Sequence, residues 1–295
     1  MKNVFSSYHP VVNLLFFCMV IGFGIFIIHP VYLCVALAAA LAYGVSLMGK
    51  SMVKLFVLGM IPVILVVTVV NMLTNPRGNT VIYHMEYSQI TMEAMVFGTL
   101  TGVLLAAVMM WFACFSKVMT GDKLMFLFGR VLPAASLIFS MVMRFLPNYR
   151  RQIGRISGAQ KGMGVSVSDG SLKSRIRHGA KIVSIMFTWA LENSIETADS
   201  MRARGYGLKG RSSFSIYRFD RRDAATTVYI LISAGVIAAA LASGKCRMEF
   251  YPDVVMAEPD ILGIAAGVVY ALLCFMPVMM QAKEVILWKY LKSKI

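Results

Sequence analysis

Long hydrophobic runs separated by short polar stretches dominate the pattern along this 295-residue chain. A run of about 18–25 apolar residues is long enough to cross a bilayer core of roughly 30 Å as an α-helix. The pattern therefore predicts six transmembrane helices, at residues 11–29, 31–49, 54–73, 94–116, 224–243 and 261–280.

Between the fourth and fifth runs, helical spacing continues but the apolar content falls. One helix is predicted to begin after Pro147 and to end at Gly162 and Gly164, because glycine accepts the left-handed conformation that often closes a helix. A second helix is predicted to begin near residue 174 and to end at Arg204-Gly205 for the same reason. Its apolar face consists of Ile182, Ile185, Met186 and Trp189, which follow helical spacing.

The composition and the distribution of charge support a membrane protein. Hydrophobic residues make up 58% of the chain and charged residues 15%, whereas soluble proteins are close to half apolar and a quarter charged. The net charge of +15 is compatible with nucleic-acid binding, but Lys and Arg gather in alternate loops, as the positive-inside rule requires. This pattern predicts that both termini and residues 117–223 are cytosolic, and it argues against a nucleic-acid partner.

A P-loop pattern occurs at residues 44–51, which read GVSLMGKS and match G-x-x-x-x-G-K-[ST]. A working P-loop follows a buried β-strand and opens a helix of a soluble α/β domain. Here the motif follows the Ala-rich run of the second predicted span. We interpret it as a short turn at the membrane interface, and we expect no ATP hydrolysis by this chain alone.

Clusters of reactive side chains are not evident in the sequence. The four His residues are scattered, and the five Cys residues form no CxxC pair. No Ser-His-Asp or paired-carboxylate pattern stands out, so no catalytic residues, metal site or cofactor are predicted. The predicted spans also hold few charged residues, and Glu93 lies near a span end. Ion-coupled transporters normally place such residues inside the membrane.

Four stretches together resemble a known family. They read NPRGNTVIY at 75–83, RFLPNYRRQIGRISGAQKGMG at 144–164, ADSMRARGYG at 198–207 and KGRSSFSIYRFDRRD at 209–223. In order and spacing they are similar to the transmembrane T component (EcfT/CbiQ-like) of energy-coupling factor (ECF) transporters. The resemblance covers most of the chain.

The resemblance implies a fold class, which agrees with the hydrophobic pattern. We expect an all-α integral membrane protein with about six transmembrane helices and long cytosolic coupling helices between the fourth and fifth spans. Residues 1–116 would hold spans one to four, and residues 117–223 the coupling helices. Residues 224–295 would hold the last two spans and a basic amphipathic tail in the cell membrane.

The resemblance also implies a mechanism. T components carry two cytosolic helix tips that dock into two ABC-type ATPases, and these ATPases bind ATP and Mg²⁺. Their closure moves the coupling helices, and the motion passes to a separate substrate-binding S component in the bilayer. The complex takes up a vitamin, a transition-metal ion or a similar micronutrient. A stand-alone secondary permease is the alternative reading of the sequence.

The family's docking motifs map onto two places in this chain. The second motif is intact as Ala203, Arg204 and Gly205. The first motif is degenerate, and it comprises Ala159, Gln160, Lys161, Gly162, Met163 and Gly164. Arg144 and Pro147 would support the first coupling helix. A Met cannot make the charge-assisted contact that Arg makes with a carboxylate. Three alternatives follow: Lys161 acts in its place, the tip docks through apolar contact, or the ATPase groove differs too. The two ATPases are therefore hypothesised to be non-identical.

Overall fold

The computed structural model describes residues 4–84, 89–164, 171–208, 217–244, 248–251, 255–256 and 261–293. The chain divides into two compact units. The first, here called the spanning unit, contains residues up to Leu124 and residues from Tyr217 onward. The second, here called the arm unit, contains Met125–Ile216. Of the predicted elements, the linker at 165–170 and much of the last loop, at 245–247, 252–254 and 257–260, lie outside the described residues.

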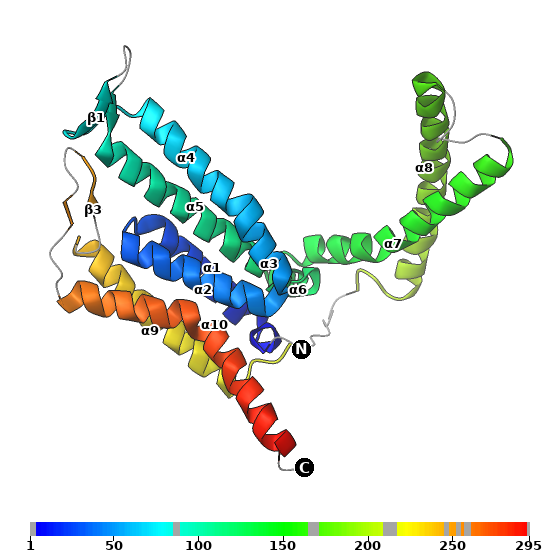
Figure 1. Cartoon of the computed structure of the whole chain (residues 1–295). Coiled ribbons are helices and arrows are strands. Elements are labelled where there is room, and N and C mark those ends of the chain that lie inside the picture. Colours follow the sequence, from blue (N-terminus) through cyan, green and yellow to red (C-terminus); the bar gives the residue numbers. More distant parts are fainter. Residues whose placement is uncertain are drawn as a thin grey trace. The chain divides into compact units, whose positions relative to one another are not determined.

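The spanning unit consists almost entirely of helices (Figure 1). A 3₁₀ turn, η1 (Phe5–Ser7), comes before the helices, and a π-helical turn, η2 (Phe56–Met60), joins α3 to α4. The helices are α1 (Pro10–Phe26), α2 (Pro30–Met48), α3 (Lys50–Leu55), α4 (Ile61–Thr74), α5 (Met92–Val118), α6 (Gly121–Val131), α9 (Arg221–Ala242) and α10 (Ile261–Ser293). Helix α6 continues past Leu124 into the arm unit.

Five of the described helices are long and apolar enough to cross a membrane, when Lys50–Thr74 is counted as one. Helix α1 is a sixth apolar helix but has only 17 residues. The predicted class, an all-α membrane protein, is confirmed. The first predicted span at 11–29 is shortened because Pro30 opens the next helix directly after His29.

Capping residues explain where several helices begin. Proline occupies the first position of α1 and of α2, where its missing N–H costs nothing. The Thr91 hydroxyl accepts a hydrogen bond from the Ala94 N–H at the start of α5, at 3.4 Å. Asp220 and Asp223 form a reciprocal capping box at the start of α9.

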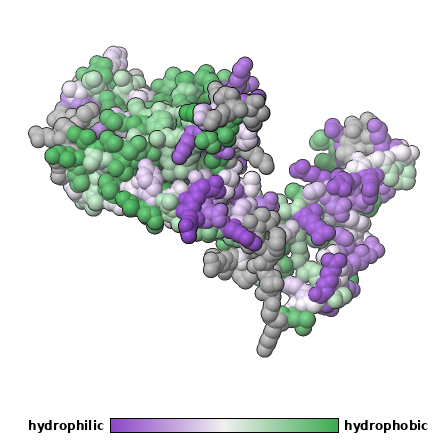
Figure 2. Space-filling model, turned by 90° about the horizontal axis from the view of Figure 1, so that it is seen from below, coloured by the Kyte–Doolittle hydropathy of each residue, from purple (hydrophilic) through white to green (hydrophobic). Residues whose placement is uncertain are grey.

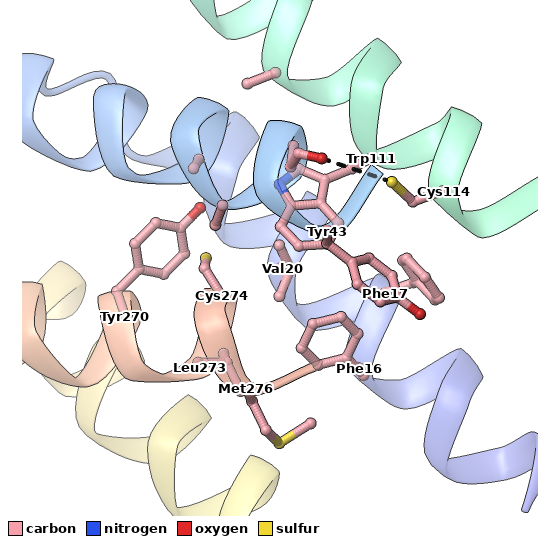
Figure 3. Packing of buried hydrophobic residues seen from close by; sticks show 14 of the residues in the cluster. Phe16, Phe17, Val20, Tyr43, Trp111, Cys114, Tyr270, Leu273, Cys274 and Met276 are labelled. Carbon is pink, nitrogen blue, oxygen red and sulfur yellow. Dashed lines mark hydrogen bonds between the residues drawn. The ribbon is translucent and has the colours of Figure 1, made fainter. Parts of the chain in front are cut away.

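Aromatic side chains fill the core of the spanning unit (Figure 3). Phe16 and Phe17 of α1 meet Trp111 of α5 edge-on, with ring centroids 5.8 and 6.1 Å apart. Tyr43 of α2 lies beside the same indole. Such edge-to-face contacts add stabilisation beyond the burial of area. They fix α1, α2 and α5 as one packed group.

Helices α4 and α5 approach each other closely because of two glycines. A Cβ added at Gly98 would lie 2.9 Å from the Asn71 Cβ and 3.1 Å from the Thr68 Cα. One added at Gly102 would lie 3.0 Å from the Ile64 Cα. The Gly-x-x-x-Gly pair on α5 thus permits backbone-to-backbone packing, which stabilises helix pairs in lipid.

Two short antiparallel hairpins were not predicted from the sequence. They pair β1 (Val81–His84) with β2 (Gln89–Thr91), and β3 (Met248–Glu249) with β4 (Val255–Met256). The loop before β1 wraps around the buried Glu93 carboxylate, whose Oε1 accepts a hydrogen bond from the Thr80 N–H at 3.1 Å. Strands of two to four residues carry too little periodicity to be recognised.

The arm unit contains two long helices, α7 (Pro133–Gly162) and α8 (Leu172–Ala203). The prediction that a new helix begins after Pro147 was wrong, because α7 runs through this residue without ending. A proline removes one helical hydrogen bond and usually kinks a helix, but the remaining bonds of a 30-residue helix keep it continuous. The basic tail is the C-terminal part of α10, which continues unbroken to Ser293.

Candidate functional site

Helices α7 and α8 cross near their middles in the arm unit (Figure 1). Tyr149 of α7 meets Trp189 of α8 edge-on, with ring centroids 5.4 Å apart. Phe145 stacks on Tyr149 at 6.1 Å and extends this contact along α7. Ile182 of α8 is also buried. Of the apolar face predicted for α8, Ile182 is buried and Met186 and Trp189 are half-buried, whereas Ile185 is exposed.

The first tip, residues 159–164, closes α7 with a tight turn. Helix α7 ends at Gly162, and Met163 follows with φ −87° and ψ 10°. The Met163 N–H donates to the Ala159 oxygen at 3.2 Å, and the Gly164 N–H donates to the Lys161 oxygen at 3.0 Å. Gly164 has φ +77°, a left-handed conformation that favours glycine. The helix end therefore lies where the sequence predicts it.

The second tip, residues 203–205, closes α8 in the same way. Helix α8 ends at Ala203, and Arg204 follows with φ −85° and ψ 7°. The Arg204 N–H donates to the Ser200 oxygen at 3.2 Å, and the Gly205 N–H donates to the Arg202 oxygen at 3.0 Å. Gly205 has φ +84°.

The two tips therefore share one backbone geometry but differ in side chains. Met163 occupies the position that Arg204 occupies in the second tip, and Gly164 corresponds to Gly205. The Met163 side chain is 65% exposed, and Arg204 is also exposed. One tip thus presents a thioether to solvent where the other presents a guanidinium.

Basic residues accompany both tips at the negative end of a helix dipole. Lys161 lies in the last turn of α7 and Arg202 in the last turn of α8. Cations in this position stabilise a helix end and leave a positive surface. Gln160 is different, because it is buried and its Oε1 accepts no hydrogen bond from the described residues. Of the two proposed support residues, Arg144 and Pro147 both lie exposed on α7.

The arm unit also exposes many large apolar side chains. On α7 they form a stripe with helical spacing, and α8 carries a second stripe on a face other than the one that meets α7. These exposed side chains are Ile138, Phe139, Val142, Leu146 and Ile153 of α7, and Ile176, Val183, Phe187, Leu191 and Ile195 of α8. Figure 2 shows hydrophilic surface concentrated on this unit with hydrophobic patches between, whereas hydrophobic surface dominates the spanning helices.

The P-loop pattern at residues 44–51 lies in a helical context. Helix α2 extends to Met48, Gly49 turns with φ +60°, and α3 begins at Lys50. No strand precedes the motif among the residues described from position 4 onward. Within the described residues there is also no group of three or more His, Cys, Asp or Glu side chains that would hold a metal ion.

Sequence reasoning missed a buried lysine, Lys123, in the first turn of α6. Its Nζ donates to the Ser6 oxygen at 2.6 Å and to the Val118 oxygen at 3.0 Å. Burial lowers the pKa of this ammonium group to about 8. A single Lys shortly after an apolar run is the only sequence signal, and interface lysines have the same signature.

The fold and the arm together define a class: a helical membrane protein with two long crossed helices that end in matching exposed turns. The sequence model of the CbiQ family, described as a cobalt transport protein, matches residues 1–216. The chain therefore belongs to the CbiQ family. Helices α9 and α10 lie beyond the matched residues.

Several curated relatives carry the name energy-coupling factor transporter transmembrane protein EcfT. The protein from Bacillus selenitireducens is 27% identical over 220 residues, which cover 70% of this chain and 82% of the relative. That from Acidaminococcus fermentans is 27% identical over 209 residues, covering 67% and 75%. EcfT from Lactobacillus helveticus is 28% identical over 103 residues, and that match spans only 37% of the relative.

Proposed function

We propose that this chain is the transmembrane coupling subunit, or T component, of an ECF-type ABC importer. In this proposal it transmits ATP-driven motion from two ABC-type ATPases to a substrate-binding S component in the bilayer. The chain itself is non-catalytic and binds no cofactor, and ATP and Mg²⁺ are bound by the ATPases. Its membership of the CbiQ family and its EcfT relatives support this reading.

One observation carries the proposal: the two tips lie at matched distances from the point where α7 and α8 cross. Met163 lies 14 residues after Tyr149, and Arg204 lies 15 residues after Trp189. At 1.5 Å per residue each tip is about 21–23 Å along its helix from the crossing pair. Two arms of similar length with the same terminal turn suit a partner that offers two similarly placed grooves, as a pair of ATPases does.

The side chains at the tips suggest how each groove differs. Arg204 would pair with a carboxylate of one ATPase, since guanidinium and carboxylate form strong bidentate contacts. Met163 would enter an apolar groove, because a thioether adapts to irregular surfaces but carries no charge. The exposed Lys161, beside Met163, would supply the positive charge of the first tip. We therefore propose that the two ATPases are different polypeptides.

The exposed apolar stripes on α7 and α8 provide the surface for the S component. A soluble protein rarely leaves so many large apolar side chains in water, and such patches mark interaction sites. A small, very apolar membrane protein lying on these helices would cover them. The S component, which holds the cargo (a vitamin, a transition-metal ion or a similar micronutrient), would then be moved by these helices together with the spanning helices to which they are joined.

The proposal places both termini and the arm unit on the cytosolic side of the cell membrane, since the basic loops alternate along the chain. A stand-alone secondary permease is the second candidate. It would need a polar site within the spans, whereas the buried acidic side chains Glu93 and Asp223 lie in the first turns of their helices. Such a permease would transport a solute in vesicles without an ATPase.

Affinity purification of the tagged chain from its native membrane in mild detergent tests the proposal. We expect two ABC-type ATPase copies and one small, very apolar membrane protein to co-purify. A variant that carries Arg177→Glu, at the far end of α8, is the control for a changed charge on the same helix. Purification of the chain without any ATPase, under conditions that keep it folded, would refute the proposal.

A further inference from the structure

The chain connects the two units at only two places, after Leu124 and before Tyr217. If the arm unit is moved by a partner, these two connections pass the displacement along the chain to the spanning unit. The residues that hold them in the spanning unit therefore decide how much motion is transmitted. Both connections are held by the same short segment at the start of the chain, residues 5–9, here called the N-terminal clasp.

The first connection is held by Lys123. This side chain is 5% exposed, and its Nζ donates to the Ser6 oxygen of the clasp at 2.6 Å. It also donates to the Val118 oxygen near the end of α5 at 3.0 Å. Hydrogen bonds from a charged donor are roughly twice as strong as neutral ones. A buried ammonium group at a helix C-terminus thus joins the clasp, α5 and the start of α6.

Asn13 of α1 completes the lysine's surroundings. This residue is fully buried. When its side-chain amide is oriented so that both the oxygen and the nitrogen have hydrogen-bond partners, the oxygen lies 2.9 Å from the Lys123 Nζ. Its amide nitrogen then donates to the Phe5 oxygen of the clasp at 2.9 Å. Lys123 therefore has three acceptors from three parts of the chain, and a buried polar group with full partners is costly to disrupt.

The second connection is held by residues 219–223. The His9 N–H of the clasp donates to the Asp223 Oδ1 at 3.2 Å. The His9 ring meets the Phe219 ring edge-on, with centroids 5.3 Å apart. The Arg222 guanidinium lies over the Tyr8 ring, 4.5 Å from its centroid, in a cation–π contact.

The two connections lie near each other in the spanning unit. At the first connection Lys123 donates to the Ser6 oxygen of the clasp, and at the second the N–H of His9, three residues after Ser6, donates to Asp223. The entry and the exit of the arm unit are therefore close together in the spanning unit, and the clasp contacts both.

We propose that the N-terminal clasp is the mechanical anchor of the arm unit, with Lys123, Arg222 and Asp223 as its positioning residues. This inference rests on the proposed function, because it assumes that a partner moves the arm unit. A firm anchor passes the displacement to α1 and α5, which share the aromatic core with the clasp residue Phe5. A loosened anchor lets the arm unit move while the spanning helices stay in place.

The test compares Lys123→Met with Lys117→Met in the complete native complex, reconstituted in vesicles. Lys117 is an exposed lysine six positions earlier, so its substitution controls for the loss of one charge. Three quantities are measured: the ATPases bound per chain, the rate of ATP hydrolysis, and the uptake of the complex's own cargo. The cargo is first identified by mass spectrometry of the purified complex.

For Lys123→Met we expect normal ATPase binding, because both tips are unchanged, and continued ATP hydrolysis. Uptake per ATP hydrolysed should fall by about tenfold, since a charge-assisted bond network is lost. Lys117→Met should keep the wild-type ratio. Arg222→Met, on the other connection, should also lower the uptake per ATP hydrolysed. This variant tests the anchor if Lys123→Met fails to fold.

The inference would be overturned if a folded Lys123→Met complex had the wild-type uptake per ATP. If Lys123→Met does not fold, the same result for Arg222→Met would overturn it. Loss of ATPase binding together with uptake would also overturn it, because the clasp would then be needed only for assembly. These results are distinct from a failure of the proposed function, in which the wild-type chain itself would bind no ATPase.

Discussion

Reversal of the charge at Arg204 is the perturbation that bears most directly on the second tip. Arg204 is exposed at the end of α8, and a surface substitution of this kind changes stability by no more than about 0.5 kcal/mol. Loss of a cation at a helix C-terminus adds a further cost of roughly 0.3–1 kcal/mol. Arg204→Glu should therefore fold and insert as the wild-type chain does.

The effect on docking should be much larger. Removing one partner of a buried, hydrogen-bonded charge pair costs about 2–5 kcal/mol. Since each 1.4 kcal/mol is tenfold in affinity, this weakens binding of one ATPase by roughly 30- to 4,000-fold. A glutamate that faces a carboxylate adds repulsion, so the upper part of this range is expected.

Titration of the purified ATPases against detergent-solubilised Arg204→Glu measures this loss, and a thermal melt confirms the fold. Arg177→Glu is the matched control, because the same charge is reversed near the start of the same helix. The control should bind as the wild type does. Equal affinity of Arg204→Glu and wild type for the ATPases would refute the docking role of Arg204.

Three further predictions concern other parts of the chain. Met163→Arg, which restores the charge missing from the first tip, should weaken the complex if that groove is apolar, whereas Met163→Leu should leave it intact; subunit stoichiometry after purification measures both. Gly102→Leu should destabilise the spanning unit by about 1–3 kcal/mol through overpacking against α4, while Gly22→Leu, which has open space around it, should change the melting temperature little. Finally, the folded-state pKa of Lys123 is about 8, below its usual 10.5. The folded chain therefore releases this proton at lower pH than the unfolded chain, and the free energy of unfolding should rise as pH increases from 8 to 10.5. In Lys123→Met this rise should be absent, and thermal melts that gave both proteins the same dependence on pH would contradict the reasoning.

The sequence predicts much of the spanning unit because lipid imposes a simple length rule. Runs of about 20 apolar residues read directly as helices, and five of the six predicted runs correspond to helices long enough to span. The exception, α1, is short because Pro30 begins a new helix early. The class of fold follows from composition and periodicity alone.

The turns at the two tips were also predictable, since Gly164 and Gly205 adopt the left-handed conformation that glycine at a helix end signals. The continuity of α7 through Pro147 was not, because whether a proline ends or merely bends a helix depends on the surrounding hydrogen bonds. The buried position of Lys123 was not predictable for a related reason. Its three acceptors come from distant parts of the sequence, and no local pattern brings them together.

The central claim is that the arm unit is moved by ATP bound to a partner. The most direct measurement is the distance between nitroxide labels at Gly158 and Ser200, two exposed positions near the tips, in the assembled complex with its natural cysteines replaced. Electron paramagnetic resonance would record this distance with and without ATP under non-hydrolysing conditions. The account predicts a reversible shift of the distance distribution when ATP binds. An identical distribution in the two states, with the ATPases bound and ATP occupancy verified, would contradict it.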